Sequence, residues 1–469
     1  MKNFSFNMKI SIVLGASLAM FSCNRDDTLN NSTSPNLLSS EDISVFKITP
    51  HYSKYNYLGS GYNATKDYAN TNSVGGLVID LDRFNNDFGI FEEDVLSQEY
   101  RENYAENALD YSLKLSRKVG FSIPLFKGVL STSFKTSSES TGKFDAKYIY
   151  GSYNVIIKQK RYRLTQPQNI LQDYLTDSFK QDLQNMSPEQ IVQFYGTHVL
   201  TDMYTGAILE IKYQAETRNT KRESTVESDV TATIKDIFDI NNKENRNTNF
   251  NRDSYNRKLV YKTRGGNPSK RLVGELNLDQ NNSKINISDW QNSSNRENAV
   301  LIDIGEKGLI VLYDLVSDPV KKAKLKTYID RYLYDNGVQL EYIPKPIYRY
   351  FNLNSGDHVY TSDGNFFFPR YRYEGVGFKA YTYKAENTIP IYQYTNMREN
   401  FYTTSSIVPY GYVIQGIAFY AHTSKVPGSK PVYRYFNVIN GDHFYTTTWE
   451  ELGIGRGGYI YEGIEFYAY

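Results

Sequence analysis

The spacing of hydrophobic and polar residues changes along the chain and predicts a mixture of strands and helices. Residues 148–162 carry apolar side chains bounded by polar residues, which is typical of a strand. Residues 171–194 mix apolar and charged residues at helical spacing, and Ser187 can cap a helix with Pro188 in its first turn. Residues 319–334 predict a further amphipathic helix. This order predicts an α+β fold for most of the chain.

One stretch has the pattern of a strand, and a second fits both a helix and a strand. In residues 115–147, apolar residues alternate with small or polar ones, as in a strand with one lipid-facing side. In residues 215–258, Val226, Val230 and Ile234 fall at helical spacing, although Val230, Ala232 and Ile234 also alternate. Residues 241–256 are almost entirely polar, so they fit a hairpin tip or a helix that stays out of lipid. The residues predicted to form a membrane hairpin are Phe121, Ile123, Leu125, Val129 and Phe134.

The end of the chain is an internal repeat. Three copies of about 40 residues begin with a Pro-x-Tyr-x-Tyr pattern at Pro346, Pro390 and Pro431. We expect about four short strands per copy, which favours an all-β, trefoil-like domain over residues 347–469. A three-bladed propeller is the less favoured geometry. Residues 341–346 are the predicted linker before this domain.

The first and third copies share an Asp-His pair followed by a tyrosine. A carboxylate, an imidazole and an aromatic ring together can bind a sugar, which predicts a glycan site. The alternative is that Asp and His hold a turn while the tyrosines pack in the core. These residues are too scattered to predict a metal site. The predicted glycan-binding residues are Asp357, His358, Tyr360, Asp442, His443 and Tyr445.

The N-terminus predicts export. Residues 1–22 combine a positively charged start with a short apolar core, as signal peptides do. Cys23 is the only cysteine in the chain, so no internal disulfide can form. Its position resembles the acylated first residue of a bacterial lipoprotein, and plain secretion is the alternative. Residues 24–27 resemble the charged signal that sends lipoproteins to the surface of Bacteroidetes-type bacteria. Residues 23–43 read as a flexible tether.

Composition and motifs argue against several classes of function. Lys and Arg number 53 against 52 Asp and Glu, so no overall field attracts nucleic acid. A mean hydropathy of −0.55 argues against a polytopic membrane protein. The chain contains no nucleophile motif, phosphate loop or zinc helix, which predicts neither an enzyme nor a cofactor. Paired carboxylates leave a glycosidase as a remote alternative.

A short signature stands between the predicted helix and a long polar insertion. It comprises Tyr195, Gly196, Thr197 and His198, followed by Gly206, and Gly265 and Gly266 come after the insertion. This order resembles the membrane attack complex/perforin (MACPF) family, and the resemblance covers residues 44–340. Ala207 stands where the family usually has a second glycine.

The resemblance implies a bent, twisted antiparallel sheet flanked by two helical clusters. In the family, each cluster unfurls into a β-hairpin, and hairpins from many subunits close into one barrel. The signature glycines would let the sheet bend, and His198 would be structural. The partners implied are target membrane lipids and further copies of the chain in a ring.

The combined interpretation is a secreted or surface-exposed bacterial lipoprotein that acts on a target-cell membrane. It would oligomerise and form pores, and its C-terminal repeats would recognise cell-surface glycans. The alternative is a non-perforating adhesin that binds host or bacterial surface glycans. The sequence leaves open whether the target is a competing bacterium or a eukaryotic host.

Overall fold

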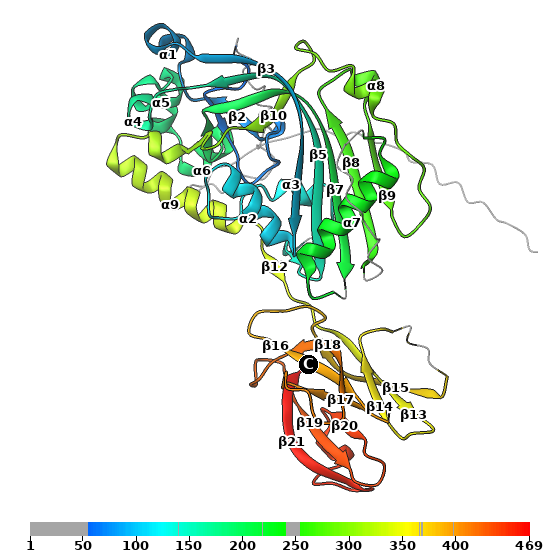
Figure 1. Cartoon of the computed structure of the whole chain (residues 1–469). Helices are drawn as coiled ribbons and strands as arrows, with labels where there is room; N and C mark the ends of the chain where they lie inside the picture. The colour runs from blue at the N-terminus through cyan, green and yellow to red at the C-terminus, as the bar shows by residue number, and fades with distance from the viewer. Residues whose placement is uncertain are drawn as a thin grey trace, which may run out of the picture. The chain divides into compact units, whose positions relative to one another are not determined.

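A long, strongly curved antiparallel sheet occupies the centre of the larger domain (Figure 1). Its strand order is β3-β5-β7-β8-β9, and β10 pairs with β7. The computed structural model describes residues 55–469 except 139, 218, 241–253, 365, 367–368 and 397. The predicted signal peptide, tether and Cys23 therefore lie outside the described residues. The strands are β3 (Phe91–Ala105), β5 (Tyr148–Arg163), β7 (Asp202–Thr217), β8 (Ser254–Arg264), β9 (Val273–Asn277) and β10 (Val300–Ile304).

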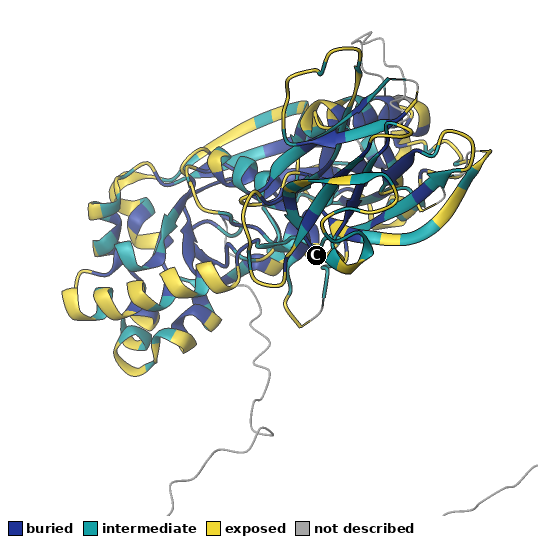
Figure 2. Ribbon diagram, turned by 90° about the horizontal axis from the view of Figure 1, so that it is seen from below, coloured by how far each residue is buried: buried dark blue, intermediate teal, exposed yellow. Residues whose placement is uncertain are grey.

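β5 and β7 are buried along most of their length because elements pack on both faces of the sheet (Figure 2). Their apolar side chains contribute to two of the main cores. One core lies beneath the helix α7 (Arg222–Ile237), and the other includes the side chains of several further helices. The strand predicted over residues 148–162 is confirmed by β5. A strand buried on both faces loses the strict alternation of apolar and polar residues, as this sequence does.

Helical segments connect two pairs of neighbouring strands. The first segment, between β3 and β5, contains α2 (Ala108–Lys118), α3 (Gly128–Ser131) and the short strand β4 (Phe144–Asp145). The second, between β7 and β8, contains α7 (Arg222–Ile237). Residues 121–125, which alternate like a strand, lie here in the turns after α2. In the described part of the chain, no helix is long and apolar enough to cross a membrane.

A second sheet and most of the remaining helices form the other end of this domain. The sheet order is β11-β6-β1-β2. Ser187 and Gln190 form the capping box of α6, which confirms the predicted helix start. The predicted helix over 319–334 is confirmed by α9, and the side chain of Asp318 caps its N-terminus. The strands are β1 (Ser60–Tyr62), β2 (Val74–Leu77), β6 (His198–Leu200) and β11 (Leu309–Val311), and the helices are α1 (Leu81–Phe88), α4 (Gln168–Leu171), α5 (Asp177–Asn185), α6 (Pro188–Tyr195) and α9 (Pro319–Asp335). The remaining helix, α8 (Ser288–Gln291), packs instead in the core beneath α7.

Each C-terminal copy forms its own three-stranded antiparallel sheet, with the first strand of the copy in the middle. The all-β prediction is confirmed, but the predicted four strands per copy, on which the trefoil geometry rested, is wrong. The predicted linker 341–346 begins in β12 (Leu340–Glu341) and ends in the first copy. The strands are β13 (Lys345–Asn352), β14 (His358–Thr361) and β15 (Tyr371–Ala380), then β16 (Ile389–Thr395), β17 (Asn400–Thr403) and β18 (Val413–Ala421), then β19 (Lys430–Asn437), β20 (His443–Thr446) and β21 (Tyr459–Ala468).

Three equivalent tyrosines hold the copies together. The backbone N–H of Tyr360 donates to the Tyr402 hydroxyl at 3.0 Å, Tyr402 N–H to Tyr445 at 2.9 Å, and Tyr445 N–H to Tyr360 at 2.8 Å. Three phenylalanine rings, Phe378, Phe419 and Phe466, contact one another at 5.4–5.6 Å between centroids. The tyrosine hydroxyls thus satisfy buried backbone groups in a threefold cycle, which explains part of the high tyrosine content.

Candidate functional site

A glycine of β7 and the glycine that directly follows β8 meet where the register between neighbouring strands shifts. Gly206 of β7 pairs with Lys158 of β5 on one side and Val300 of β10 on the other. A Cβ on Gly206 would lie 1.9 Å from the carbonyl oxygen of Ile157, and one on Gly265 would lie 2.4 Å from the carbonyl oxygen of Gly206. The structure therefore brings together two signature glycines that are far apart in the sequence, because only backbone fits between these strands.

Gly266 and Trp290 close the same corner. Gly266 has φ +76°, a conformation that favours glycine, and the indole of Trp290 donates to the carbonyl of Gly265 at 3.0 Å. Ala207, which replaces the family's second glycine, is fully buried beside Gly265. Sequence reasoning missed Trp290, because no local pattern indicates which backbone carbonyl an indole will meet.

We expect Gly206→Ala to destabilise the fold. The added methyl would collide with a backbone carbonyl that belongs to the central sheet, so overpacking should cost about 3 kcal/mol or more. Urea unfolding followed by tryptophan fluorescence measures the loss. Gly377→Ala is the matched control, since a Cβ there meets its nearest neighbours at an ordinary 3.5 Å. Equal unfolding midpoints for the two variants would contradict the steric argument.

The Tyr195-Gly196-Thr197-His198 signature joins α6 to the small sheet. The Tyr195 hydroxyl donates to Asp182 at 2.6 Å, and Thr197 N–H donates to the carbonyl of Tyr62 in β1 at 3.0 Å. Gly196 has φ +80° and lies against the backbone of Tyr62, which leaves no room for a side chain.

His198 is fully buried. Its Nδ1 lies 2.8 Å from the Thr197 hydroxyl, and its ring meets Phe121 edge-on at 4.8 Å. Burial lowers the pKa of His198 to about 3, so the imidazole is neutral at physiological pH. These contacts fit the structural role that we predicted for it.

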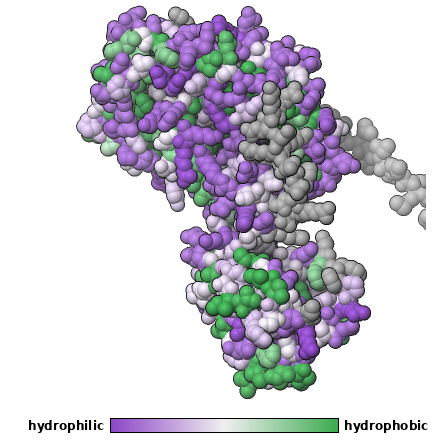
Figure 3. Space-filling view, viewed as in Figure 1, coloured by the Kyte–Doolittle hydropathy of each residue, from purple (hydrophilic) through white to green (hydrophobic). Residues whose placement is uncertain are grey.

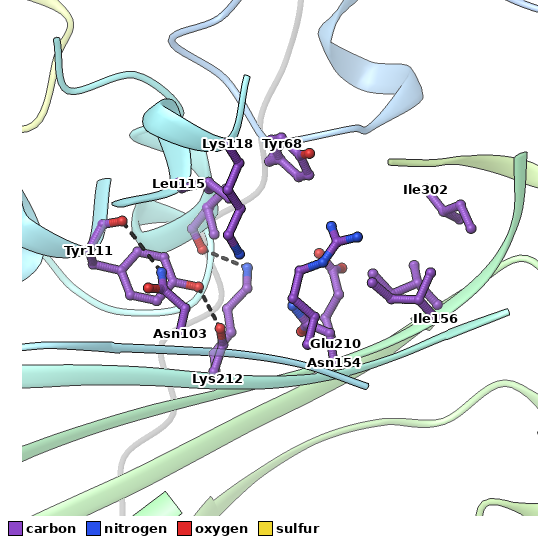
Figure 4. A pocket seen from close by; sticks show the side chains of 14 residues that line it. Tyr68, Asn103, Tyr111, Leu115, Lys118, Asn154, Ile156, Glu210, Lys212 and Ile302 are labelled. Atoms are coloured by element: carbon purple, nitrogen blue, oxygen red, sulfur yellow. Dashed lines mark hydrogen bonds between the residues drawn. The ribbon is translucent and has the colours of Figure 1, made fainter. Parts of the chain in front are cut away.

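Charged groups lie on the sheet beneath the first helical segment (Figure 4). The Lys212 ammonium of β7 donates to the carbonyl of Val129 at 2.6 Å and to Ser133 Oγ at 3.2 Å. Burial lowers the pKa of Lys212 to about 8. Burial would raise the pKa of Glu210, but Arg264 and the nearby lysines hold it near 2.

A small cavity of about 30 Å³ separates these groups from α2, which is room for one or two water molecules. The segment therefore rests partly on buried charges rather than on a continuous apolar core. Buried charges regain hydration when a covering segment leaves, which offsets part of the lost packing. This arrangement favours a segment that can separate from the sheet.

The second segment packs on a glycine of β5. A Cβ on Gly151 would lie 2.7 Å from Val230 Cγ2 and 3.0 Å from Val226 Cγ2, so the missing side chain lets α7 approach closely. Val226, Val230 and Ile234 recur every four residues and are all buried. The helical spacing found in the sequence is thus the face that α7 buries.

Arg222, at the start of α7, ties the two segments together. Its guanidinium donates to the carbonyls of Glu106 and Ala146 at 2.9 Å each, and to those of the next two residues at 3.0 and 3.1 Å. Lys114 of α2 also forms an ion pair with Glu223 of α7 at 2.8 Å. The ends of the first segment and the start of the second are therefore in direct contact.

Both segments leave the sheet at the same end. Ala105 is paired with Tyr150, Tyr148 with Glu216, and Thr217 with Ser254. The ends of four neighbouring strands therefore lie side by side, and each segment connects two of them. Of the predicted membrane residues, Phe121 is half-buried and Ile123 is exposed, whereas Leu125, Val129 and Phe134 are buried.

Comparison with known protein families matches residues 48–341 to the MAC/Perforin domain, which is more than half of the chain. The chain belongs to the MAC/Perforin family. This match confirms the MAC/Perforin resemblance found in the sequence. MAC/Perforin domains have a fold of the membrane-binding, pore-forming type. Residues 327–407 and 346–469 match a domain of unknown function, DUF5648. No curated protein matched the chain.

Solved structures similar to this MAC/Perforin protein include a putative cell invasion protein with a MAC/Perforin domain from Bacteroides thetaiotaomicron. It is 18% identical, with 67% of each chain covered and a TM-score of 0.49. Another is GNIP1Aa from Chromobacterium piscinae, 16% identical, with 83% of this chain and 74% of that chain covered and a TM-score of 0.47. A structure of pneumolysin is 10% identical, with 63% and 60% covered and a TM-score of 0.26.

The predicted glycan residues lie inside the C-terminal repeats and contact one another across copies. Asp357 accepts from the backbone N–H and the side-chain amide of Asn400, both at 2.8 Å. Asp442 accepts from the backbone N–H of His358 at 2.8 Å and from its Nδ1 at 2.7 Å. Glu399 accepts from the backbone N–H of His443 at 3.0 Å and from its Nδ1 at 2.8 Å.

This cycle argues against the tyrosine contacts of the predicted glycan site, and sugar binding itself stays a prediction. Tyr360 and Tyr445 are 2% and 1% exposed, so neither ring can stack on a sugar, and Asp357 and Asp442 already accept several hydrogen bonds. The alternative interpretation, with Asp and His at turns and tyrosines in the core, matches the structure. Glu399 belongs to the same cycle, and it was missed because the pairing runs between copies.

We expect the stability of these repeats to fall as pH rises from 5 to 8. Burial lowers the pKa of His358, but its hydrogen bonds to Asp442 and Glu374 outweigh burial and raise that pKa above 6.5. Burial raises the pKa of Asp357 to about 6. A raised folded-state pKa favours the protonated form, so its stabilisation is lost as pH rises through that pKa. Calorimetric unfolding across this pH range checks the trend.

His358→Asn copies the arrangement of Asn400 in the second copy. An asparagine there keeps an amide that can donate to Asp442, but it removes the imidazolium and its ion pair with Glu374 at 3.5 Å. The variant should therefore show a weaker pH dependence above pH 6.5. An unchanged pH profile in this variant would exclude His358 as its source.

Proposed function

We propose that this protein binds target membranes, oligomerises and inserts its two helical segments as β-hairpins that form a pore. The observation that carries the proposal is that both segments place their apolar residues on one side when they are drawn as strands. In α7, Val226, Val230 and Ile234 lie four residues apart. Because four is even, these residues share one face of a helix and also one face of a strand.

The first segment is also one-sided when it is drawn as a strand, over a longer stretch. Leu109, Tyr111, Leu113 and Leu115 alternate with Asp110, Ser112, Lys114 and Ser116. After Arg117 the pattern continues through Val119, Phe121, Ile123 and Leu125. In a membrane this face would meet lipid while the opposite face, rich in hydroxyl and charged groups, would meet water.

Position and length support the same function. The segments span residues 106–147 and 218–253, and a membrane-crossing strand needs only about 9–11 residues. Since both segments continue the neighbouring ends of four paired strands, their hairpins would extend one existing sheet. The buried charges beneath the first segment and the tie at Arg222 would let the two segments leave together.

The test is dye leakage from liposomes by the mature protein, with the same samples imaged for rings. Leakage accompanied by rings is the expected result. Rings without leakage would favour assembly without perforation, and binding without either would favour an adhesin. The alternative is a glycan-binding adhesin, but the predicted stacking residues Tyr360 and Tyr445 are buried. We therefore assign no sugar-binding residues to this alternative. We also propose a non-enzymatic function for an exported protein.

A further inference from the structure

The loop ends of the C-terminal repeats expose aliphatic side chains that the fold does not use. In the third copy, Ile439 and Ile454 are 80% and 86% exposed, and Val438 and Ile460 are also exposed. Val438 and Ile439 lie against the end of the loop that carries Ile454: Val438 N–H donates to the Gly458 carbonyl, and a Cβ on Gly458 would meet Ile439 at 2.7 Å. Hydrophobic surface gathers in groups on this part of the chain (Figure 3).

The second copy repeats the feature at the same end of its sheet. Ile407, Val408 and Tyr410 are exposed in the loop between β17 and β18, and Val413 begins β18. The first copy exposes Leu353, whose N–H donates to the Arg370 carbonyl across the same end. All three copies therefore present apolar side chains where their first strands end and their last strands begin.

The loop ends of the copies are joined to one another. The side chain of Asn440 in the third copy donates to the Gly356 carbonyl of the first at 3.2 Å. The Asp357–Asn400, Glu399–His443 and Asp442–His358 pairs complete a ring of contacts between loops. A shared base holds the apolar tips in fixed relative positions, so they can meet one extended surface together.

The charges of these loops suit an anionic surface. The carboxylates of Asp357, Glu399 and Asp442 are buried in the ring of contacts. Among the charged residues of these loops, the exposed ones are Arg370, Arg398, Arg456 and a single acid, Glu450. Arginine beside exposed aliphatic and tyrosine side chains is the composition of a membrane-interface surface.

We propose that this loop end enters the headgroup and upper acyl region of an anionic bilayer. The inference rests on the proposed membrane function and assigns the first contact to the repeats rather than to the helical segments. Aliphatic tips would bury in the interface while the arginines meet lipid phosphate and carboxylate groups. This contact would hold the protein at the membrane before the segments leave the sheet.

The test uses the full chain with Cys23→Ser, so that no acyl anchor contributes. Flotation with phosphatidylcholine vesicles containing phosphatidylserine measures binding. Ile439→Asp combined with Ile454→Asp should weaken partitioning by about 100-fold or more, since each buried isoleucine is worth about tenfold. Val320→Asp, at an aliphatic residue of α9 that is 62% exposed, is the control and should bind normally.

A second measurement does not depend on a loss of binding. An environment-sensitive dye on Ile454→Cys should brighten when vesicles are added, and the same dye on Val320→Cys should not. Normal flotation of the double variant, or no dye response, would overturn the proposal. So would dissociation of a solution oligomer by the double variant, which would make the surface a contact between copies.

Leakage assays separate this proposal from the pore. Wild-type protein that binds through Ile454 but never releases dye would contradict pore formation and leave the membrane surface standing. A double variant that floats normally and still releases dye would contradict the surface and leave the pore standing.

Discussion

Oxidised Gly151→Cys/Val230→Cys protein is expected to leave dye-loaded liposomes intact, and reduction is expected to restore leakage. A Cβ on Gly151 would lie 2.7 Å from Val230 Cγ2, so the two new Cβ atoms fall within disulfide reach. The bond would fasten α7 to β5. If α7 must leave the sheet to become a hairpin, a covalent link blocks that step while allowing binding.

The cysteine pair belongs in a Cys23→Ser background, because Cys23 is the chain's only cysteine. Gly151→Cys and Val230→Cys alone are the matched controls, and the first also shows whether a new side chain on β5 displaces α7. Flotation of the oxidised double variant should match that of the wild type. Leakage at the same rate before and after reduction would contradict the unfurling of α7.

The second large effect is expected when two neighbouring residues are each replaced by lysine in separate variants. Ile123→Lys should abolish leakage, whereas Ser122→Lys should leave it near the wild-type rate. Both residues are exposed in this structure, so neither change should disturb folding. In the proposed strand they face opposite sides, and a lysine on the lipid face near the bilayer centre costs about 2–4 kcal/mol per subunit.

Urea unfolding of both variants provides the control for folding, and flotation provides the control for binding. Because the penalty applies to every subunit of a ring, mixing Ile123→Lys protein with wild type should reduce leakage more than simple dilution does. Equal leakage by the two variants would contradict the strand assignment of residues 109–125. Loss of leakage by Ser122→Lys alone would place the opposite face in lipid.

Local signals in the sequence predicted the elements of this protein well. The cap formed by Ser187 and Gln190, the apolar run of β5 and the helix over residues 319–334 depend on neighbours in the chain, and all three are present. The three C-terminal copies were also visible, because each copy repeats the same strands. The number of strands per copy was overestimated, since each copy has three strands in the described residues.

The roles of individual residues depended on partners far away. Tyr360 and His358 looked like ligand contacts because their copy alone shows no partner for them. Their partners, Tyr402 and Asp442, belong to other copies. Lys212 and Arg222 drew no attention in the sequence, yet one lies under the first segment and the other ties both segments together.

The sequence by itself determined the family, several of its helices and strands, and the apolar pattern of the two segments. These properties follow from residue spacings of two to four positions and from a short signature motif. Tertiary structure alone decided that Gly206 meets Gly265, that four strand ends lie side by side, and that the repeat carboxylates are buried while aliphatic loop tips remain exposed. Burial and long-range pairing arise from the packing of distant segments, and local residue patterns carry no record of that packing.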